Sequence, residues 1–188
     1  MSVHRIAYRF RGLLISPLPV IALFLFNHET EIDSLIWPLG CSILLLGMFL
    51  RIWAQQHLHY RLKLRKSLTT TGPYSFMRNP IYVGNMLMCL GAVITSEVLW
   101  LAPIILFYCF SIYSLVVHYE EEHLLEKYGG PYQRYLSEVP RWFPRVIRCR
   151  NLGLINRYFL ISVVAEIHCP LLLVPYALKE LVSPWLGH

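Results

Sequence analysis

The chain of 188 residues is 56% hydrophobic, has a mean hydropathy of +0.47 and carries a formal net charge of +6. Its length suits one domain, and the long apolar stretches that recur along it are typical of a protein that crosses a membrane several times, which excludes an ordinary soluble domain. The basic residues gather in particular loops and not along one helix face. We therefore expect them to set membrane topology, and we expect no nucleic-acid partner.

The cysteines and histidines give no sign of a disulfide framework or a metal site. No two cysteines form a C-x-x-C pair, and most lie within apolar stretches, where a thiol packs as a small hydrophobic group. They are Cys41, Cys89, Cys109, Cys149 and Cys169. His57 and His59 have no acidic or cysteine partner at metal-ligand spacing. We interpret both as residues of the membrane interface and predict no metal.

Five apolar segments predict an all-α fold in which residues 1–188 form a single membrane domain. A basic arm precedes the first segment, which lacks the small residues of a signal-peptide cleavage site, so we expect it to be retained. The expected transmembrane helices are residues 12–26, 35–53, 80–96, 99–117 and 155–181. The third and fourth should form a helical hairpin turning at Glu97. An amphipathic helix over residues 118–129 should follow, ending at Gly129-Gly130-Pro131.

The basic residues predict the orientation of these helices. All but Lys179 of the 17 lysines and arginines fall in residues 1–11, 51–78 and 127–157, which five spans place on one side. The segments on the opposite side carry acidic residues, namely Glu29, Glu31, Asp33 and Glu97. By the positive-inside rule the basic side is cytoplasmic. We expect an integral protein of the plasma or inner membrane in a prokaryote, or of the endoplasmic reticulum in a eukaryote.

Residues 71–84 lead from a turn into an apolar helix and carry the first candidate site. Gly72-Pro73 predicts a tight turn. Asn79-Pro80 predicts a helix start, with Asn as N-cap and Pro at the first helical position. Such a start directs free N–H groups and the positive end of the helix dipole at the loop that holds Arg78, which makes a pocket for a carboxylate or phosphate. The alternative is a plain surface loop whose Arg78 faces lipid headgroups.

A second polar group follows the fourth expected span. Glu120, Glu121 and Glu122 stand together at the membrane boundary, where unpaired carboxylates are costly. They form either a solvated stretch, most readily for Glu122, or a site in which one or two of them face inward. Further along lie Tyr132, Tyr135 and Arg141. The two tyrosine rings belong either to an interfacial belt or to a cation site. A cytoplasmic pocket that combines these features suits a zwitterionic or cationic cofactor.

In this order, and across one helical hairpin, the two groups resemble the isoprenylcysteine carboxyl methyltransferase and phospholipid methyltransferase group of integral membrane enzymes. That family shows a G-x-Y-x-x-x-R-[HN]-P-x-Y-x-G segment, then a Glu-Glu pair and a G-x-x-Y-x-x-Y-x-x-x-V-P-x-x-x-P tail. The matching residues are Gly72, Tyr74, Arg78, Asn79, Pro80, Tyr82, Gly84, Glu120, Glu121, Gly129, Tyr132, Tyr135, Val139, Pro140 and Pro144. The resemblance covers a catalytic core of about residues 47–144 and leaves 155–181 as an extra hydrophobic segment.

The resemblance implies S-adenosyl-L-methionine as the cofactor, bound in a cytoplasmic pocket. By resemblance, the cofactor-binding residues are Tyr74, Arg78, Asn79, Pro80, Tyr82, Glu120 and Glu121. Arg78 and the helix start at Asn79 suit the methionyl carboxylate. Glu120 or Glu121 suits the ribose hydroxyls or the amino group. Methyl transfer from a sulfonium needs mainly in-line positioning and electrostatics.

Two departures from the prenylcysteine enzymes concern the acceptor. Those enzymes have an arginine directly before the Val-Pro pair, where this chain has Glu138, and a glutamate three residues before Arg51, where it has Met48. Both charges would handle a carboxylate substrate, so their loss argues against a prenylcysteine carboxylate and leaves an amine, a thiol or another lipophilic acceptor. Arg141 is a candidate replacement for the missing charge. With Glu121 it makes up the expected catalytic pair.

The expected function is methylation of a lipophilic acceptor that enters from the bilayer, with membrane lipids around it and with O-, N- and S-methylation all open. One alternative is an NADPH-dependent membrane reductase of the sterol type, which shares the R-[HN]-P-x-Y segment but commonly has an acidic residue where this chain has Asn85. The other is a non-catalytic membrane scaffold. Glu166 and His168 lie in the last apolar segment. They form either an interhelical hydrogen bond or part of the acceptor site.

Overall fold

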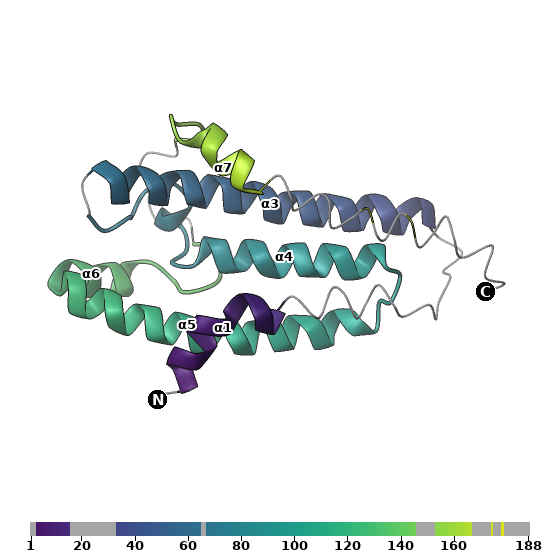
Figure 1. The fold of residues 1–188 in the computed structure, drawn as a ribbon, viewed down its shortest axis with the longest axis horizontal. Helices are drawn as coiled ribbons and strands as arrows, with labels where there is room; N and C mark the ends of the chain where they lie inside the picture. The colour runs from purple at the N-terminus through teal and green to yellow at the C-terminus, as the bar shows by residue number, and fades with distance from the viewer. Residues whose placement is uncertain are drawn as a thin grey trace.

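The computed structural model describes residues 3–15, 33–64, 67–145 and 153–166, together with positions 174 and 178. Over these residues it contains helices and no strand, which confirms the all-α expectation. Three long helices, α3 (Asp33–Leu64), α4 (Pro80–Thr95) and α5 (Leu101–Tyr128), run side by side in alternating directions, with α4 in the middle (Figure 1). The end of α3, the start of α4 and the end of α5 therefore meet at one end of the molecule, which we call the polar end.

The shorter elements surround this bundle of three helices (Figure 1). α1 (Val3–Ile15) crosses α5, and α7 (Phe159–Glu166) lies against α3. A single turn of 3-10 helix, η1 (Gly72–Ser75), and the helix α6 (Gly130–Glu138) lie at the polar end. The expected basic arm at the amino terminus is thus largely helical. The remainder of the first expected span falls outside the described residues, and so does the last one beyond Glu166 apart from positions 174 and 178.

Two helices are long and apolar enough to cross a membrane, Leu35–Leu58 within α3 and Leu101–Tyr128, each with a mean hydropathy of 1.9. α4 is apolar but has only 16 residues. Large hydrophobic side chains cover the outer faces of α3 and α5, as shown by exposed fractions of 68% for Leu35 and 75% for Phe107. Apolar surface of this extent indicates a face that contacts lipid, in agreement with a membrane protein.

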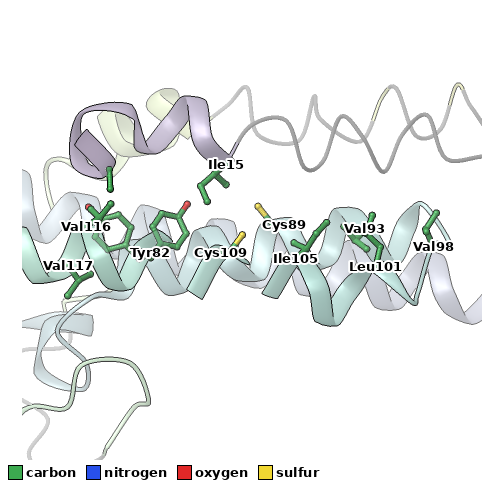
Figure 2. Close-up of a cluster of buried hydrophobic side chains, with 12 residues drawn as sticks. Ile15, Tyr82, Cys89, Val93, Val98, Leu101, Ile105, Cys109, Val116 and Val117 are labelled. Carbon is green, nitrogen blue, oxygen red and sulfur yellow. The ribbon is translucent and has the colours of Figure 1, made fainter. Parts of the chain in front are cut away.

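The hairpin of α4 and α5 forms as predicted. Glu97 has a φ of +64° in the turn between them. Their interface is packed with small and branched side chains, including the buried thiols of Cys89 and Cys109 beside Val93 and Ile105 (Figure 2). Both cysteines are free, which confirms that these two act as small hydrophobic groups.

Two helix boundaries differ from the expectation. The second span was expected to end at Trp53, but the helix α3 continues to Leu64 and is about 48 Å long over its 32 residues, of which Leu35–Leu58 are apolar enough to cross a membrane. The sequence from Ala54 to Thr71 contains neither Gly nor Pro, so nothing stops the helix where its composition turns polar. The fourth span and the amphipathic segment after it likewise form the single helix α5. This helix ends at Gly129, which has a φ of +57°.

α3 and α4 approach each other most closely where their glycines meet. A Cβ on Gly47 would lie 2.6 Å from the carbonyl oxygen of Gly84, and a Cβ on Gly84 would lie 2.7 Å from Cγ of Arg51. Gly40 and Gly91 make a similar contact seven residues away, where a Cβ on Gly40 would lie 2.9 Å from the Gly91 oxygen. Small residues allow membrane helices to pack with their backbones in contact. This contact brings the side chain of Arg51 directly against α4.

Candidate active site

The loop between α3 and α4 forms the predicted turn and is fixed by a buried histidine. Gly72 has a φ of +61°, and a Cβ there would lie 2.5 Å from Nε2 of His57. Nε2 of His57 donates to the carbonyl oxygen of Gly153 at 3.0 Å, while Nδ1 accepts from the Thr71 hydroxyl at 3.1 Å. His57, which was expected at the membrane interface, has a side chain that is buried within the protein and joins three segments. The side chain of His59 lies outside the described residues.

α4 begins at Pro80 with Asn79 at the N-cap position, as predicted, but the Asn79 side chain makes no capping hydrogen bond. Its Nδ2 instead donates to the carbonyl oxygen of Arg141 at 3.1 Å. The first N–H groups of α4 therefore have no side-chain cap from the chain itself. They open onto a cavity that Asn79, Pro80 and Ile81 help to line.

Hydrogen bonds join the two polar groups that lie far apart in the sequence. The backbone N–H of Arg78 donates to the carbonyl oxygen of Pro140 at 2.9 Å. The Tyr135 hydroxyl donates to the carbonyl oxygen of Tyr74 at 2.7 Å. These contacts place α6 and the segment after it against the loop that precedes α4. The structure thus brings the two predicted groups together at the polar end.

The three consecutive glutamates of α5 have different surroundings. Glu120 accepts a hydrogen bond from the Tyr82 hydroxyl at 2.7 Å. Glu121 lies 3.5 Å from Nη1 of Arg78 and also accepts two hydrogen bonds from Arg141, of which the one from Nε is 3.2 Å long. Glu122 points outward, where its exposed side chain pairs with His118. Two glutamates therefore face inward and one faces outward.

A cavity of about 1070 Å³ opens between these elements. All seven residues predicted for the cofactor line it, namely Tyr74, Arg78, Asn79, Pro80, Tyr82, Glu120 and Glu121. Arg141 is not among the lining residues and reaches the cavity only through Glu121. The predicted residues thus converge on one site, with Arg141 behind it.

Burial keeps the tyrosines of the polar end in their neutral form. It raises the pKa of Tyr74, and the charge of Glu120 raises it further. It likewise raises the pKa of Tyr132 and of Tyr135, with Glu121 adding to the effect at Tyr132. The three phenols therefore remain hydrogen-bond donors over the physiological pH range.

Arg78 has capacity left for a ligand. Its side chain is 13% exposed, and its Nε is buried with no hydrogen-bond partner among the described residues. A buried donor of this kind is costly unless something accepts from it. Together with the uncapped start of α4, it fits a ligand with a carboxylate, while Glu120 and Glu121 fit hydroxyl and ammonium groups. The donor set suits an amino-acid-containing cofactor.

Several lining residues were not predicted from the sequence. Tyr8, Arg9 and Arg11 of α1 line the cavity, and the Arg11 guanidinium lies over the Tyr8 ring at 4.4 Å from its centroid. The only sequence signal for α1 was its basic charge, which topology already explained. The lining also includes Arg51, Gln55, Asn85 and Tyr113 from the three long helices. In the described ranges, no three His, Cys, Asp or Glu side chains come together as a possible metal site.

The chain is similar to several characterised proteins. It is 29% identical over 131 residues to the cobalt-zinc-cadmium resistance protein CzcN of Cupriavidus metallidurans, covering 68% of this chain and 59% of that protein. It is 26% identical to the protein-S-isoprenylcysteine O-methyltransferase of Saccharomyces cerevisiae, covering 64% of this chain and 53% of that enzyme. The chain thus spans a little over half the length of these two relatives. No solved structure matches it.

The match to a sterol reductase is confined to a short stretch. The chain is 35% identical over 78 residues to the Delta(14)-sterol reductase LBR of Gallus gallus, which is 40% of this chain but 12% of that protein. This partial match does not favour the reductase alternative.

A sequence profile of the family described as phospholipid methyltransferase matches residues 36–130, just over half of the chain. The matched region begins in α3 and ends at the start of α6, so it includes Arg78-Asn79-Pro80 and the inward-facing pair Glu120 and Glu121. It therefore contains most of the walls of the cavity described above. The chain belongs to the phospholipid methyltransferase family.

Proposed function

We propose that the chain is an integral membrane methyltransferase that uses S-adenosyl-L-methionine to methylate a lipophilic small molecule or a lipid-modified acceptor. Family membership supports the reaction class. The observation that carries the cofactor assignment is the convergence of the seven predicted residues, from Tyr74 to Glu121, on one cavity of about 1070 Å³. Ligand sites of ~300–1,000 Å³ are usual for small molecules, so this cavity has room for a cofactor and the reactive part of an acceptor.

The residues of the polar end divide the binding of the cofactor between them. When bound, S-adenosyl-L-methionine supplies an electrophilic methyl group carried on a sulfonium sulfur. Arg78, through its unpaired Nε, and the start of α4 would hold the carboxylate. Glu120 and Glu121 would accept hydrogen bonds from the amino group or the ribose hydroxyls.

Glu121 and Arg141 have different parts in this proposal. Glu121 lines the cavity and would contact the cofactor directly. Arg141 binds Glu121 from behind and is a positioning residue, which fixes the carboxylate by a two-point contact. Rigid placement of such groups lowers the barrier of a reaction that depends on in-line geometry.

The membrane arrangement is part of the same proposal. We infer five transmembrane helices, with the polar end on the cytoplasmic side and the acceptor entering between helices from the bilayer. The apolar outer faces of α3 and α5 and the placement of the basic residues support this arrangement. Within a bacterium the protein would belong to the inner membrane, and within a eukaryote to the endoplasmic reticulum.

The decisive experiment is calorimetric titration of the detergent-solubilised protein with S-adenosylhomocysteine and, separately, with NADPH. We expect micromolar binding of S-adenosylhomocysteine and no binding of NADPH. Glu121→Ala should abolish the binding, whereas Glu122→Ala, which removes the exposed neighbouring carboxylate, should leave it intact. Binding of NADPH alone would replace the methyltransferase with the reductase. Binding of neither compound would favour a membrane scaffold.

A further inference from the structure

The cavity has a second polar region, deeper in the bundle than the residues assigned to the cofactor. We call it the inner pocket and define it by Arg51 and Gln55 of α3, Asn85 of α4 and Tyr113 of α5, all of which line the cavity. Asn85 lies about one helical turn beyond Tyr82, and Tyr113 about two turns before Glu120. The inner pocket is therefore continuous with the cofactor region and lies further from the polar end.

A buried carboxylate from the carboxyl-terminal part of the chain stands behind the inner pocket. Glu166, the last residue of α7, has an exposed fraction of 1%. It accepts a hydrogen bond from Nη2 of Arg51 at 2.7 Å and another from Nε2 of Gln55. Nη1 of Arg51 donates to Oδ1 of Asn85. Glu166 itself does not line the cavity, so it acts on a bound molecule only through Arg51 and Gln55.

The ion pair between Arg51 and Glu166 determines the net charge of the inner pocket. Arg51 is its one lining residue with a full positive charge, and the charge of Glu166 balances it within one ion pair. A carboxylate entering the pocket would compete with Glu166 for Nη2 and would place a second negative charge near a buried one. An uncharged head would meet amide and phenol groups that donate and accept hydrogen bonds without disturbing the ion pair.

Resting on the proposed function, we propose that the inner pocket binds the reactive head of the acceptor and selects an uncharged thiol, hydroxyl or amine over a carboxylate. Glu166 is the positioning residue that sets this selectivity, because it occupies Nη2 of Arg51 and balances the charge that would otherwise attract a carboxylate. The head forms its new bond to the methyl carbon while the carbon–sulfur bond of the donor breaks. The electron pair of that bond stays on sulfur, and the proton of the head passes to water.

The test compares decanol, decanethiol and decanoate, which share one alkyl chain and differ in the head. Their dissociation constants are measured at neutral pH by calorimetry on the protein in lipid nanodiscs, loaded with S-adenosylhomocysteine. We expect the tighter-binding of decanol and decanethiol to bind at least ~tenfold more tightly than decanoate, and we call the quotient of these two dissociation constants the selectivity ratio. Glu166→Gln should reduce this ratio about tenfold by strengthening decanoate binding, because Arg51 becomes free for a charge-assisted hydrogen bond. Glu122→Gln, the same substitution at an exposed position, should leave the ratio unchanged.

Each result decides the proposal. A wild-type protein that prefers decanoate, or binds none of the three, overturns it, and so does a Glu166→Gln variant with an unaltered ratio. Binding of S-adenosylhomocysteine by that variant reports whether it folds, and if it does not fold, the wild-type ratio alone decides. If the wild-type protein does not bind S-adenosylhomocysteine at all, the proposed function itself is refuted. Failure of the proposed function can therefore be distinguished from failure of the proposed selectivity.

Discussion

At the polar end, the inward-facing glutamates are held by side chains from distant segments of the chain. Glu121 is held between Arg78, from the loop before α4, and Arg141, from the segment after α6. Glu120 is held by Tyr82 of α4. A buried carboxylate is tolerated only when its partners remain in place, so the orientation of both glutamates depends on residues outside α5.

Replacement of Arg141 by alanine should lower turnover more than it weakens cofactor binding. Glu121 keeps Arg78 as a second partner at 3.5 Å, so the cofactor site persists while its orientation loosens. We expect kcat to fall about tenfold and the dissociation constant of S-adenosylhomocysteine to change less than about threefold. Steady-state kinetics and calorimetry measure the two quantities. Weaker cofactor binding with unchanged turnover would contradict this role.

Replacement of Tyr82 by phenylalanine should weaken cofactor binding by about tenfold, or ~1.4 kcal/mol, because Glu120 loses its hydroxyl donor. The matched control is Tyr108→Phe, which removes a hydroxyl that donates to the carbonyl oxygen of Leu14 and does not line the cavity. Titration with S-adenosylhomocysteine compares the two variants. Equal affinities would rule out a role for the Tyr82–Glu120 contact in binding.

The site residues differ in how far the sequence could predict them. Tyr82, Glu120 and Glu121 belong to the two motifs that resemble the methyltransferase family, so their convergence on one cavity could be expected. The contact between Arg51 and Glu166 could not be, because 115 positions separate them and no periodicity links the two residues. Only the charge of Glu166 within an apolar segment marked it as a candidate, and Arg51 was not predicted as a site residue.

Among the helices, the position of α3 against α4 sets the shape of the cavity. Because Gly84 has no side chain, Arg51 packs directly against α4, and its guanidinium reaches Asn85 on the same helix. The length of α3 matters as well. Because it extends to Leu64, it presents Gln55 and His57 from a continuous helix and not from a loop.

Gly84→Ala should destabilise the protein by about 1–3 kcal/mol, because the new Cβ would lie 2.7 Å from Cγ of Arg51 and 2.8 Å from the Gly47 oxygen. Gly130→Ala is the matched control, since a Cβ there meets nothing within 4 Å. Thermal unfolding in detergent, followed by circular dichroism, compares the two. Equal melting temperatures would show that α3 and α4 adjust to the methyl group without cost.

The sequence predicted which helices exist better than where they end. Pro80 marked the start of α4 because proline fixes its φ and lacks an N–H, and Gly129 marked the end of α5 because glycine readily adopts the positive φ found there. The end of α3 carries no such marker. There the change from apolar to polar residues was taken as a helix end, although it marks only where the helix leaves its apolar surroundings.

At the scale of the whole molecule, the polar end and the turn at Glu97 lie at opposite ends of the bundle (Figure 1). The proposed topology places the polar end in the cytoplasm.

We expect Gln133→Cys, in α6, to react with a membrane-impermeant maleimide only after cells are permeabilised. Trp100→Cys, in the turn, should react in intact bacterial cells that carry the protein in the inner membrane. Both positions are exposed, and both variants are made in a background without the five native cysteines. The reverse labelling pattern would invert the topology.

The position of α7 shows that the region matched by the family profile makes contacts with residues that follow it. The family match ends at residue 130, yet the guanidinium of Arg51 is balanced by Glu166, and His57 is held by Gly153. In this chain, residues 36–130 therefore depend on contacts with residues beyond the family match. A fragment cut after Pro144 would keep the residues of the family motifs but would lose the carboxylate that pairs with Arg51. In this chain, α7 therefore completes the polar interior of the three-helix bundle, and a core transplanted without it would lack the partner of Arg51.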